Sequence, residues 1–117
     1  MSYMLVIVEP PGQRETRTEA EGRALYDSMV RYSEALKARG LLTIAQSLKD
    51  DARGARVKVR NGAASVLDGP FSEAKEMIGG IFMLTCDTRE QAIAIAAECP
   101  AAQWATVEVR ELGPCFQ

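Results

Sequence analysis

Two short runs of apolar residues, at positions 3–8 (YMLVIV) and 81–86 (IFMLTC), constrain the fold of this chain more than any other feature. Runs that are apolar at nearly every position are typical of strands buried on both faces of a sheet. The rest of the sequence predicts two helices, which cover only one face. We therefore expect a second copy of the chain to cover the other face with two-fold symmetry. The alternative is that central strands leave some apolar surface exposed.

Each apolar run is followed by a predicted helix. Thr18 and Glu21 stand at the spacing of a capping box, in which each side chain bonds the backbone amide of the other residue. The helix that they open ends at Gly40 and carries its apolar residues at i, i+4, i+7 and i+11: Leu25, Met29, Tyr32 and Leu36. A second helix is predicted to start at Asp87 and Glu90 and to stop before Pro100, because proline disrupts a helix interior.

Three further segments predict strands. Residues 41–48 and 105–112 are single strands, whereas residues 56–67 form a hairpin because Asn61-Gly62 is a strong two-residue turn signal. The order is strand–helix–strand, hairpin, strand–helix–strand. It predicts a single domain over residues 1–117 of the α+β class, ferredoxin-like with an antiparallel sheet, an extra hairpin and two main helices.

Charge and composition limit the partners. Fourteen basic residues against sixteen acidic ones give a net charge of −2, which argues against nucleic acid and anionic membranes as partners. No apolar segment approaches the roughly 20 residues that cross a bilayer, and the N-terminus shows no targeting signal. The three cysteines form no C-x-x-C motif, so we expect neither a disulfide framework nor a zinc site, and a cytoplasmic location.

The sequence contains no histidine. This removes the commonest general base, the commonest metal ligand and every histidine-dependent catalytic triad. Catalysis in this chain would therefore depend on carboxylates, lysine, tyrosine, cysteine or backbone groups. We expect neither a metal ion nor a cofactor.

The connection at residues 66–80 (VLDGPFSEAKEMIGG) is longer and more distinctive in composition than a link between strands needs to be. Gly69 permits a positive φ or a close backbone approach, and Pro70 fixes its own φ. Phe71 is large enough to anchor the loop in the core, and Asp68 is placed to accept N–H bonds from the turn. On this interpretation the loop is structural.

The end of the same loop also has a structural interpretation. Ser72 is a good N-cap for a short helix, with Glu73 in its first turn. Gly79 and Gly80 would then give a flexible entry into the next strand.

The same loop supports a functional interpretation. A carboxylate of Asp68 or Glu73 would exchange a proton if burial raised its pKa, with Lys75 stabilising negative charge. Alternatively, the helix start and Lys75 would hold an anionic ligand. The catalytic candidates are Asp68, Glu73 and Lys75, and the residues expected to border a ligand are Asp68, Gly69, Pro70, Phe71, Glu73, Lys75 and Glu76.

These residues carry a resemblance to a known family. Asp68-Gly69-Pro70-Phe71, followed by Glu73, Lys75-Glu76 and Gly79-Gly80, resembles the D-G-P-F-x-E-x-K-E-x-x-G-G signature of the DGPF family within the YCII-related superfamily. The resemblance implies a ferredoxin-like domain that associates as a dimeric α/β barrel, with this loop beside a cleft. Many members are encoded next to extracytoplasmic-function sigma factors. Some YCII-type relatives were proposed to be enzymes because of a histidine–aspartate pair, which this chain does not have.

Our leading hypothesis is a homodimer that binds a small molecule and acts as an accessory or sensory partner in regulation linked to a sigma factor. The alternative is an enzyme for a small substrate that uses carboxylate and lysine acid–base chemistry without histidine. A protein-interaction module without a ligand is a third hypothesis.

Overall fold

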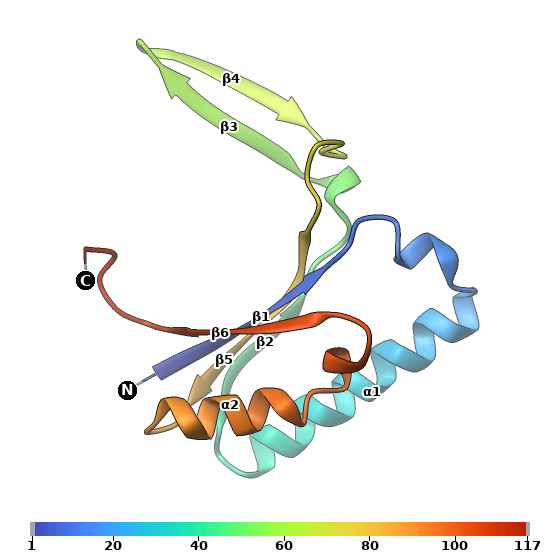
Figure 1. Cartoon of the computed structure of the whole chain (residues 1–117), viewed down its shortest axis with the longest axis vertical. Helices are drawn as coiled ribbons and strands as arrows, with labels where there is room; N and C mark the ends of the chain where they lie inside the picture. Colours follow the sequence, from blue (N-terminus) through green and yellow to red (C-terminus); the bar gives the residue numbers. More distant parts are fainter. Residues whose placement is uncertain (1, 117) are drawn as a thin grey trace.

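The two apolar runs lie side by side as the central strands of a four-stranded antiparallel sheet (Figure 1). The structure is a computed structural model and describes residues 2–116. Its sheet order is β2-β5-β1-β6, formed by β1 (Ser2–Glu9), β2 (Leu42–Ser47), β5 (Met77–Thr85) and β6 (Thr106–Glu111). Over these residues the predicted α+β, ferredoxin-like class is confirmed, with an antiparallel sheet, two α-helices and an added hairpin.

Helix α1 (Glu19–Ala38) begins and ends where the sequence predicts. The Glu21 N–H donates to Thr18 Oγ1 at 3.1 Å, and the Thr18 N–H donates to Glu21 Oε1 at 2.8 Å. Gly40 follows the helix with φ 72°, a left-handed conformation that favours glycine. No helix among residues 2–116 is both long enough and apolar enough to span a membrane.

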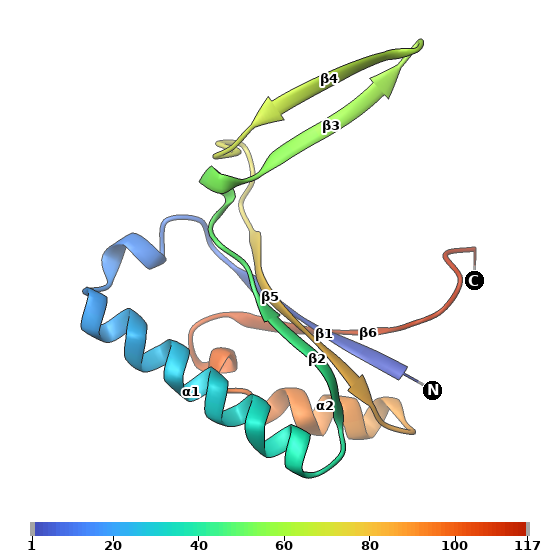
Figure 2. The ribbon, with the colours of Figure 1, turned by 180° about the vertical axis from the view of Figure 1, so that it is seen from behind.

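Helix α2 (Arg89–Ala97) starts slightly later than predicted. Its N-cap is Thr88 rather than Asp87, because Thr88 Oγ1 accepts the Gln91 N–H at 3.1 Å. The Asp87 N–H instead donates to the Gln91 side chain at 3.2 Å. Both helices lie on the same face of the sheet (Figures 1 and 2).

The core lies between the sheet and the two helices. β1 alternates along its length, and Tyr3, Leu5 and Ile7 are buried on the helix-facing side. Tyr32 of α1 packs edge-on against Phe82, with ring centroids 5.5 Å apart. Its hydroxyl donates to the Ile95 carbonyl at 2.6 Å, which satisfies a buried polar group. Burial raises the pKa of this hydroxyl.

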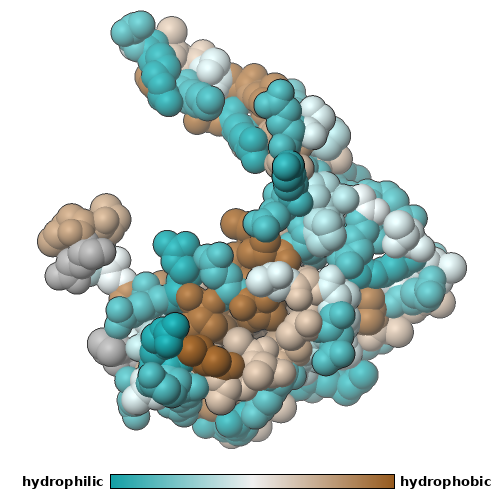
Figure 3. Space-filling model, in the orientation of Figure 1, coloured by the Kyte–Doolittle hydropathy of each residue, from teal (hydrophilic) through white to brown (hydrophobic). Residues whose placement is uncertain are grey.

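The opposite face of the sheet carries no helix. It presents an apolar surface that we call the open-face patch, visible in the hollow beneath the hairpin (Figure 3). The patch consists of Met4, Val6, Val8, Ile44, Ile78, Ile81 and Met83. On β6 it is bordered by an ion pair between Arg110 and Glu108 at 3.1 Å. We expected both faces of the sheet to be buried. Within the described chain, only the helix-facing side is.

The predicted hairpin is present and projects from the rest of the molecule (Figures 1 and 2). It consists of β3 (Ala55–Arg60) and β4 (Ala63–Asp68), which form a separate two-stranded sheet. Asn61 and Gly62 have φ values of 52° and 76°, as a two-residue hairpin turn requires. Every residue of both strands is exposed.

The loop after the hairpin differs from the prediction. The expected short helix after Ser72 is wrong, since a turn closed by the Ala74 N–H on the Phe71 carbonyl at 2.9 Å takes its place. β5 already starts at Met77, opposite Glu9, so too few residues remain for a helix. Gly79 and Gly80 accordingly lie inside β5 and are not a flexible entry to it.

Candidate functional site

Helix α1 meets the sheet through its C-terminal half and diverges from it toward its N-terminus (Figures 1 and 2). Tyr32 and Leu36, in the C-terminal half, belong to the core. Between the N-terminal half and the sheet lies a cavity of about 610 Å³, which we call the α1 cavity. It is on the helix-facing side of the sheet, opposite the open-face patch.

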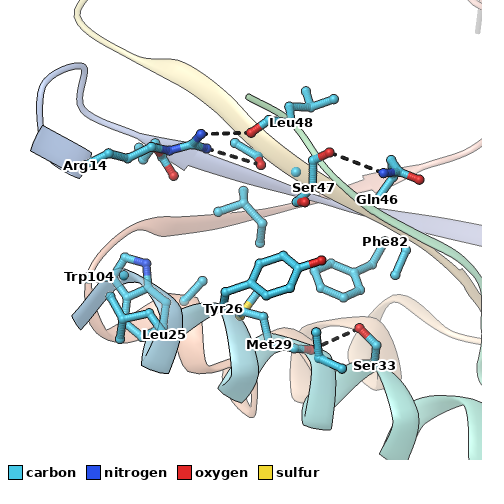
Figure 4. Close-up of a pocket in the computed structure, with 18 of the residues that line it drawn as sticks. Arg14, Leu25, Tyr26, Met29, Ser33, Gln46, Ser47, Leu48, Phe82 and Trp104 are labelled. Carbon is cyan, nitrogen blue, oxygen red and sulfur yellow. Dashed lines mark hydrogen bonds and ion pairs between the residues drawn. The ribbon is translucent and has the colours of Figure 1, made fainter. Parts of the chain in front are cut away.

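The walls of the α1 cavity are largely apolar and include aromatic rings (Figure 4). From the helix come Leu25, Tyr26 and Met29, and from the other elements Ile7, Phe82 and Trp104. Trp104 is tied to the β1–α1 connection, because Gln13 Nε2 donates to its carbonyl at 2.8 Å. Arg17 places its guanidinium carbon 5.9 Å from the centroid of the Trp104 ring, a distance at which a cation and an aromatic ring attract each other.

An ion pair between Glu9 and Arg14 lies in the wall on the sheet side. Glu9 is only 5% exposed, and its Oε1 accepts from Arg14 Nε at 2.6 Å. Arg14 Nη1 also donates to the Leu48 carbonyl at 2.8 Å, and Arg14 Nη2 to the Gly79 carbonyl at 3.5 Å. Arg14 thus ties the β1–α1 connection to β5 and to the end of β2. A buried carboxylate needs such a partner to offset its loss of hydration.

Gly79 makes room for this ion pair. In the β1–β5 pairing, Ile7 stands opposite Gly80 and Val8 opposite Ile78, so Gly79 is the extra residue of a β-bulge. A Cβ at this position would clash with Glu9 Oε2 and lie 2.9 Å from Arg14 Nη2. A residue with a side chain would fit here only if the ion pair shifted.

A second, more open cleft of about 690 Å³ adjoins the first. Glu9 and Trp104 line both, so the two spaces share a wall. Lys75 and Glu76 lie on the outer cleft, which places two of the predicted residues near Glu9. Gln13 also lines it, and Gln13 Oε1 is buried without a hydrogen-bond partner among residues 2–116.

The other predicted site residues lie at the base of the hairpin and line neither of these two spaces. Asp68, Pro70 and Glu73 are exposed, so the loop brings no buried carboxylate together with Lys75. Gly69 provides the close backbone approach, because a Cβ there would clash with the Asp51 carbonyl.

The structure also corrects the expected roles of two side chains in the loop. Phe71 is not in the core: it is half-buried beneath Arg56, whose guanidinium carbon lies 4.0 Å from the ring centroid. Asp51, and not Asp68, accepts the turn amide, from the Phe71 N–H at 3.3 Å. Phe71 therefore anchors the hairpin base.

Glu9 and Arg14 were absent from the sequence prediction. The signal for Glu9 was the period of two along the first strand, which places it on the same face as Tyr3, Leu5 and Ile7. No local pattern marks Arg14. Among the described residues no group of three or more Cys, Asp or Glu side chains stands close enough to share a metal ion.

Comparison with known proteins identifies a family and a similar solved structure. The family model of the YCII-related domain matches residues 1–115. Among solved structures, 5-chloro-2-hydroxyhydroquinone dehydrochlorinase (TftG) from Burkholderia phenoliruptrix AC1100, in complex with 2,5-dihydroxybenzoquinone, is similar with a TM-score of 0.54. The sequences are 16% identical, and the match covers 97% of this chain and 94% of that chain, so this likeness concerns the fold. The search of curated proteins returned no match.

Proposed function

Since the chain belongs to the YCII-related domain family, we propose that it binds a small and mostly apolar molecule in the α1 cavity. The observation that carries this proposal is the cavity itself, about 610 Å³, whose walls combine apolar and aromatic side chains with the Glu9–Arg14 ion pair and further polar side chains. Ligand sites typically measure about 300–1,000 Å³ and combine apolar walls with a few convergent polar groups. An open space of this kind also forgoes packing contacts that a small domain would otherwise gain.

An enzyme is the second candidate function. The observation that favours it is Glu9, a buried carboxylate between two adjoining spaces with Lys75 on the outer one. The structural relative is named as a dehydrochlorinase, and we propose small-molecule acid–base chemistry as the related activity. Asp68 and Glu73 are exposed, so Glu9 takes the role of proton acceptor in this candidate. If Glu9→Gln abolished turnover and Glu73→Gln left it intact, the result would favour an enzyme over a protein that only binds its ligand.

We further propose that the chain is a homodimer and an accessory or sensory partner in sigma-factor-linked regulation. The open-face patch supports the dimer, because no element of the described chain covers it. The loop of residues 68–76, with Asp68, Glu73, Lys75 and Glu76 exposed, is suited to contact with a regulatory partner. The resemblance of that loop to a family associated with sigma factors supports the choice of partner.

The test of the binding proposal fills the α1 cavity from the helix side. Gly22 of α1 lines the cavity, and a Cβ built there meets no atom within 4 Å. Gly22→Leu should occupy the space while keeping the helix, because leucine favours helices more than glycine does. Gly22→Ala is the matched control, and it should stabilise the protein by about 0.5–1 kcal/mol without filling the cavity.

Native mass spectrometry and a thermal-shift panel of aromatic compounds provide the readout. We expect wild type and Gly22→Ala to hold ligand and Gly22→Leu to lose it. Asp68→Ala tests the loop as the site, and a loss of ligand confined to that variant would move the site to the hairpin base. A panel in which no compound raises the unfolding temperature of wild type would contradict the binding proposal.

A further inference from the structure

We infer that Glu9 recognises its ligand by accepting a hydrogen bond from a hydroxyl group carried on an aromatic ring. This inference rests on the proposed function, because it names the class of molecule that the α1 cavity binds. The class is that of neutral phenols and naphthols.

Half of the Glu9 carboxylate is left without a partner. Oε1 accepts from Arg14 Nε, whereas Oε2 accepts no hydrogen bond from any residue between positions 2 and 116. Gln13 Oε1 is buried, whereas Glu9 Oε2 is accessible to solvent. Glu9 itself lines the α1 cavity. An ionised carboxylate is an acceptor only. A ligand group that takes the place of solvent there must therefore be a donor.

Three of the five N–H donors of the Arg14 guanidinium are already used within the protein. Its Nε donates to Glu9, its Nη1 to the Leu48 carbonyl and its Nη2 to the Gly79 carbonyl. The charge of its guanidinium is already offset by the carboxylate of Glu9 at 2.6 Å. A ligand carboxylate beside this pair would face the like charge of Glu9, which disfavours it. Arg17, near Trp104, is the remaining cation on the cavity wall and represents the competing anion hypothesis.

The walls indicate an aromatic carrier for the donor. Tyr26, Phe82 and Trp104 contribute rings, and Met29 contributes a thioether (Figure 4), groups that make favourable contacts with aromatic rings. A phenolic hydroxyl has a pKa of about 10. It therefore stays protonated at pH 7 and remains a donor.

Three naphthalene probes separate the possibilities by isothermal titration calorimetry on the full chain. 2-Naphthol carries the donor, 2-methoxynaphthalene has the same ring with an acceptor only, and 2-naphthoate is an anion. We expect wild type to bind 2-naphthol roughly tenfold to hundredfold more tightly than 2-methoxynaphthalene, the range for one hydrogen bond to a charged group. We expect 2-naphthoate to bind more weakly than 2-naphthol.

Glu9→Gln tests the residue. The glutamine carbonyl would keep the bond from Arg14, so its NH₂ group would face the cavity as a donor. We expect this variant to lose the preference for 2-naphthol over 2-methoxynaphthalene. Glu111→Gln is the matched control, because Glu111 is exposed on β6 and lines neither of the two spaces, and it should keep the preference. Circular dichroism tests whether both variants fold. If Glu9→Gln does not fold, the comparison of 2-naphthol with 2-methoxynaphthalene on wild type still decides whether the ligand must be a donor.

The outcomes separate this inference from the proposed function. Equal binding of 2-naphthol and 2-methoxynaphthalene by wild type would overturn the donor inference and leave cavity binding intact. A preference that persists in folded Glu9→Gln would overturn the role of Glu9, since it would then reflect only the bulk of the methyl group. Tightest binding of 2-naphthoate would overturn the inference in favour of Arg17. Binding of none of the probes would overturn it together with the proposed apolar site.

Discussion

Gly79 shows how much of this site depends on a missing side chain. Its place in the β-bulge lets β5 run directly over the Glu9 carboxylate, and its carbonyl accepts from Arg14 Nη2 and from the Leu48 N–H. One residue therefore connects β5, β2 and the β1–α1 connection. Bulges often redirect side chains beside functional sites. Here the bulge accommodates a buried ion pair.

Gly79→Ala should displace that ion pair. The added Cβ would clash with Glu9 Oε2, so the pair has to move or separate. Because an uncompensated buried charge is costly, we expect the free energy of unfolding to fall by about 1–3 kcal/mol. Urea denaturation measures the change.

The control for this change is Gly113→Ala, because Gly113 is exposed and a Cβ there meets nothing within 4 Å. It should leave the urea midpoint almost unchanged. Equal midpoints for the two alanine variants would show that the ion pair does not depend on the bulge.

At the scale of elements, the residues that cap the N-terminus of α1 stabilise the helix beside the cavity. Hydrogen bonds from the backbone of Thr18 and then from its side chain lower the pKa of Glu21 below its ordinary value of 4.5. A carboxyl group whose pKa is lower in the folded state stabilises the fold when it is ionised. This contribution is complete above the unfolded-state pKa and is lost as the pH falls through the folded-state value.

Glu21→Gln should therefore lower the thermal midpoint at pH 7. The difference from wild type should shrink as the pH falls below about 4, where both states of wild type become protonated. Differential scanning calorimetry between pH 7 and pH 2.5 measures it. Glu15→Gln, at an exposed residue in the first turn of the short helix Arg14–Thr16, is the control. A difference that persists unchanged at pH 2.5 would contradict a role for ionised Glu21.

The elements that were predictable from the sequence are those set by local rules. The capping box at Thr18, the turn at Asn61-Gly62 and the two central strands depend on neighbouring residues or on strong periodicity. The prediction of a helix after Ser72 was wrong because strand pairing between Met77 and Glu9 took precedence over a local capping signal.

The site was less predictable than the elements. The two-residue period of its strand could have predicted that Glu9 is buried. The cavity, however, depends on the angle between α1 and the sheet, which no local pattern encodes. The motif residues Asp68 and Glu73 were candidates for the site in the sequence prediction, yet the structure leaves them exposed at the hairpin base. Gly79 belongs to the same motif, and its contact with Glu9 joins residues 70 positions apart through the β1–β5 pairing.

At the scale of the whole molecule, the open-face patch is the surface that carries the proposed assembly. Ile44 is 50% exposed within it, and Met83 stands opposite Ile44 on β5. Exposed apolar surfaces of this kind commonly mark contacts between proteins. A second copy placed on this face with two-fold symmetry would cover the same patch on both chains.

Ile44→Glu should prevent this association. We expect wild type to behave as a dimer in size-exclusion chromatography with light scattering, at twice the chain mass of 12.8 kDa, and the variant as a monomer. A buried carboxylate without a partner opposes association. Ile93→Glu is the matched control, because Ile93 is 41% exposed on α2, away from the patch. A monomeric wild type, or equal behaviour of the two variants, would contradict an interface on the open face.

The divergence of α1 from the sheet has an evolutionary consequence. One wall of the cavity comes from one face of one helix, at Gly22, Leu25, Tyr26 and Met29, while the open-face patch lies across the sheet from it. Substitutions in the N-terminal half of α1 can therefore alter the size of the cavity without changing the open-face patch. The cavity and the exposed apolar surface of such a scaffold can change along separate mutational routes.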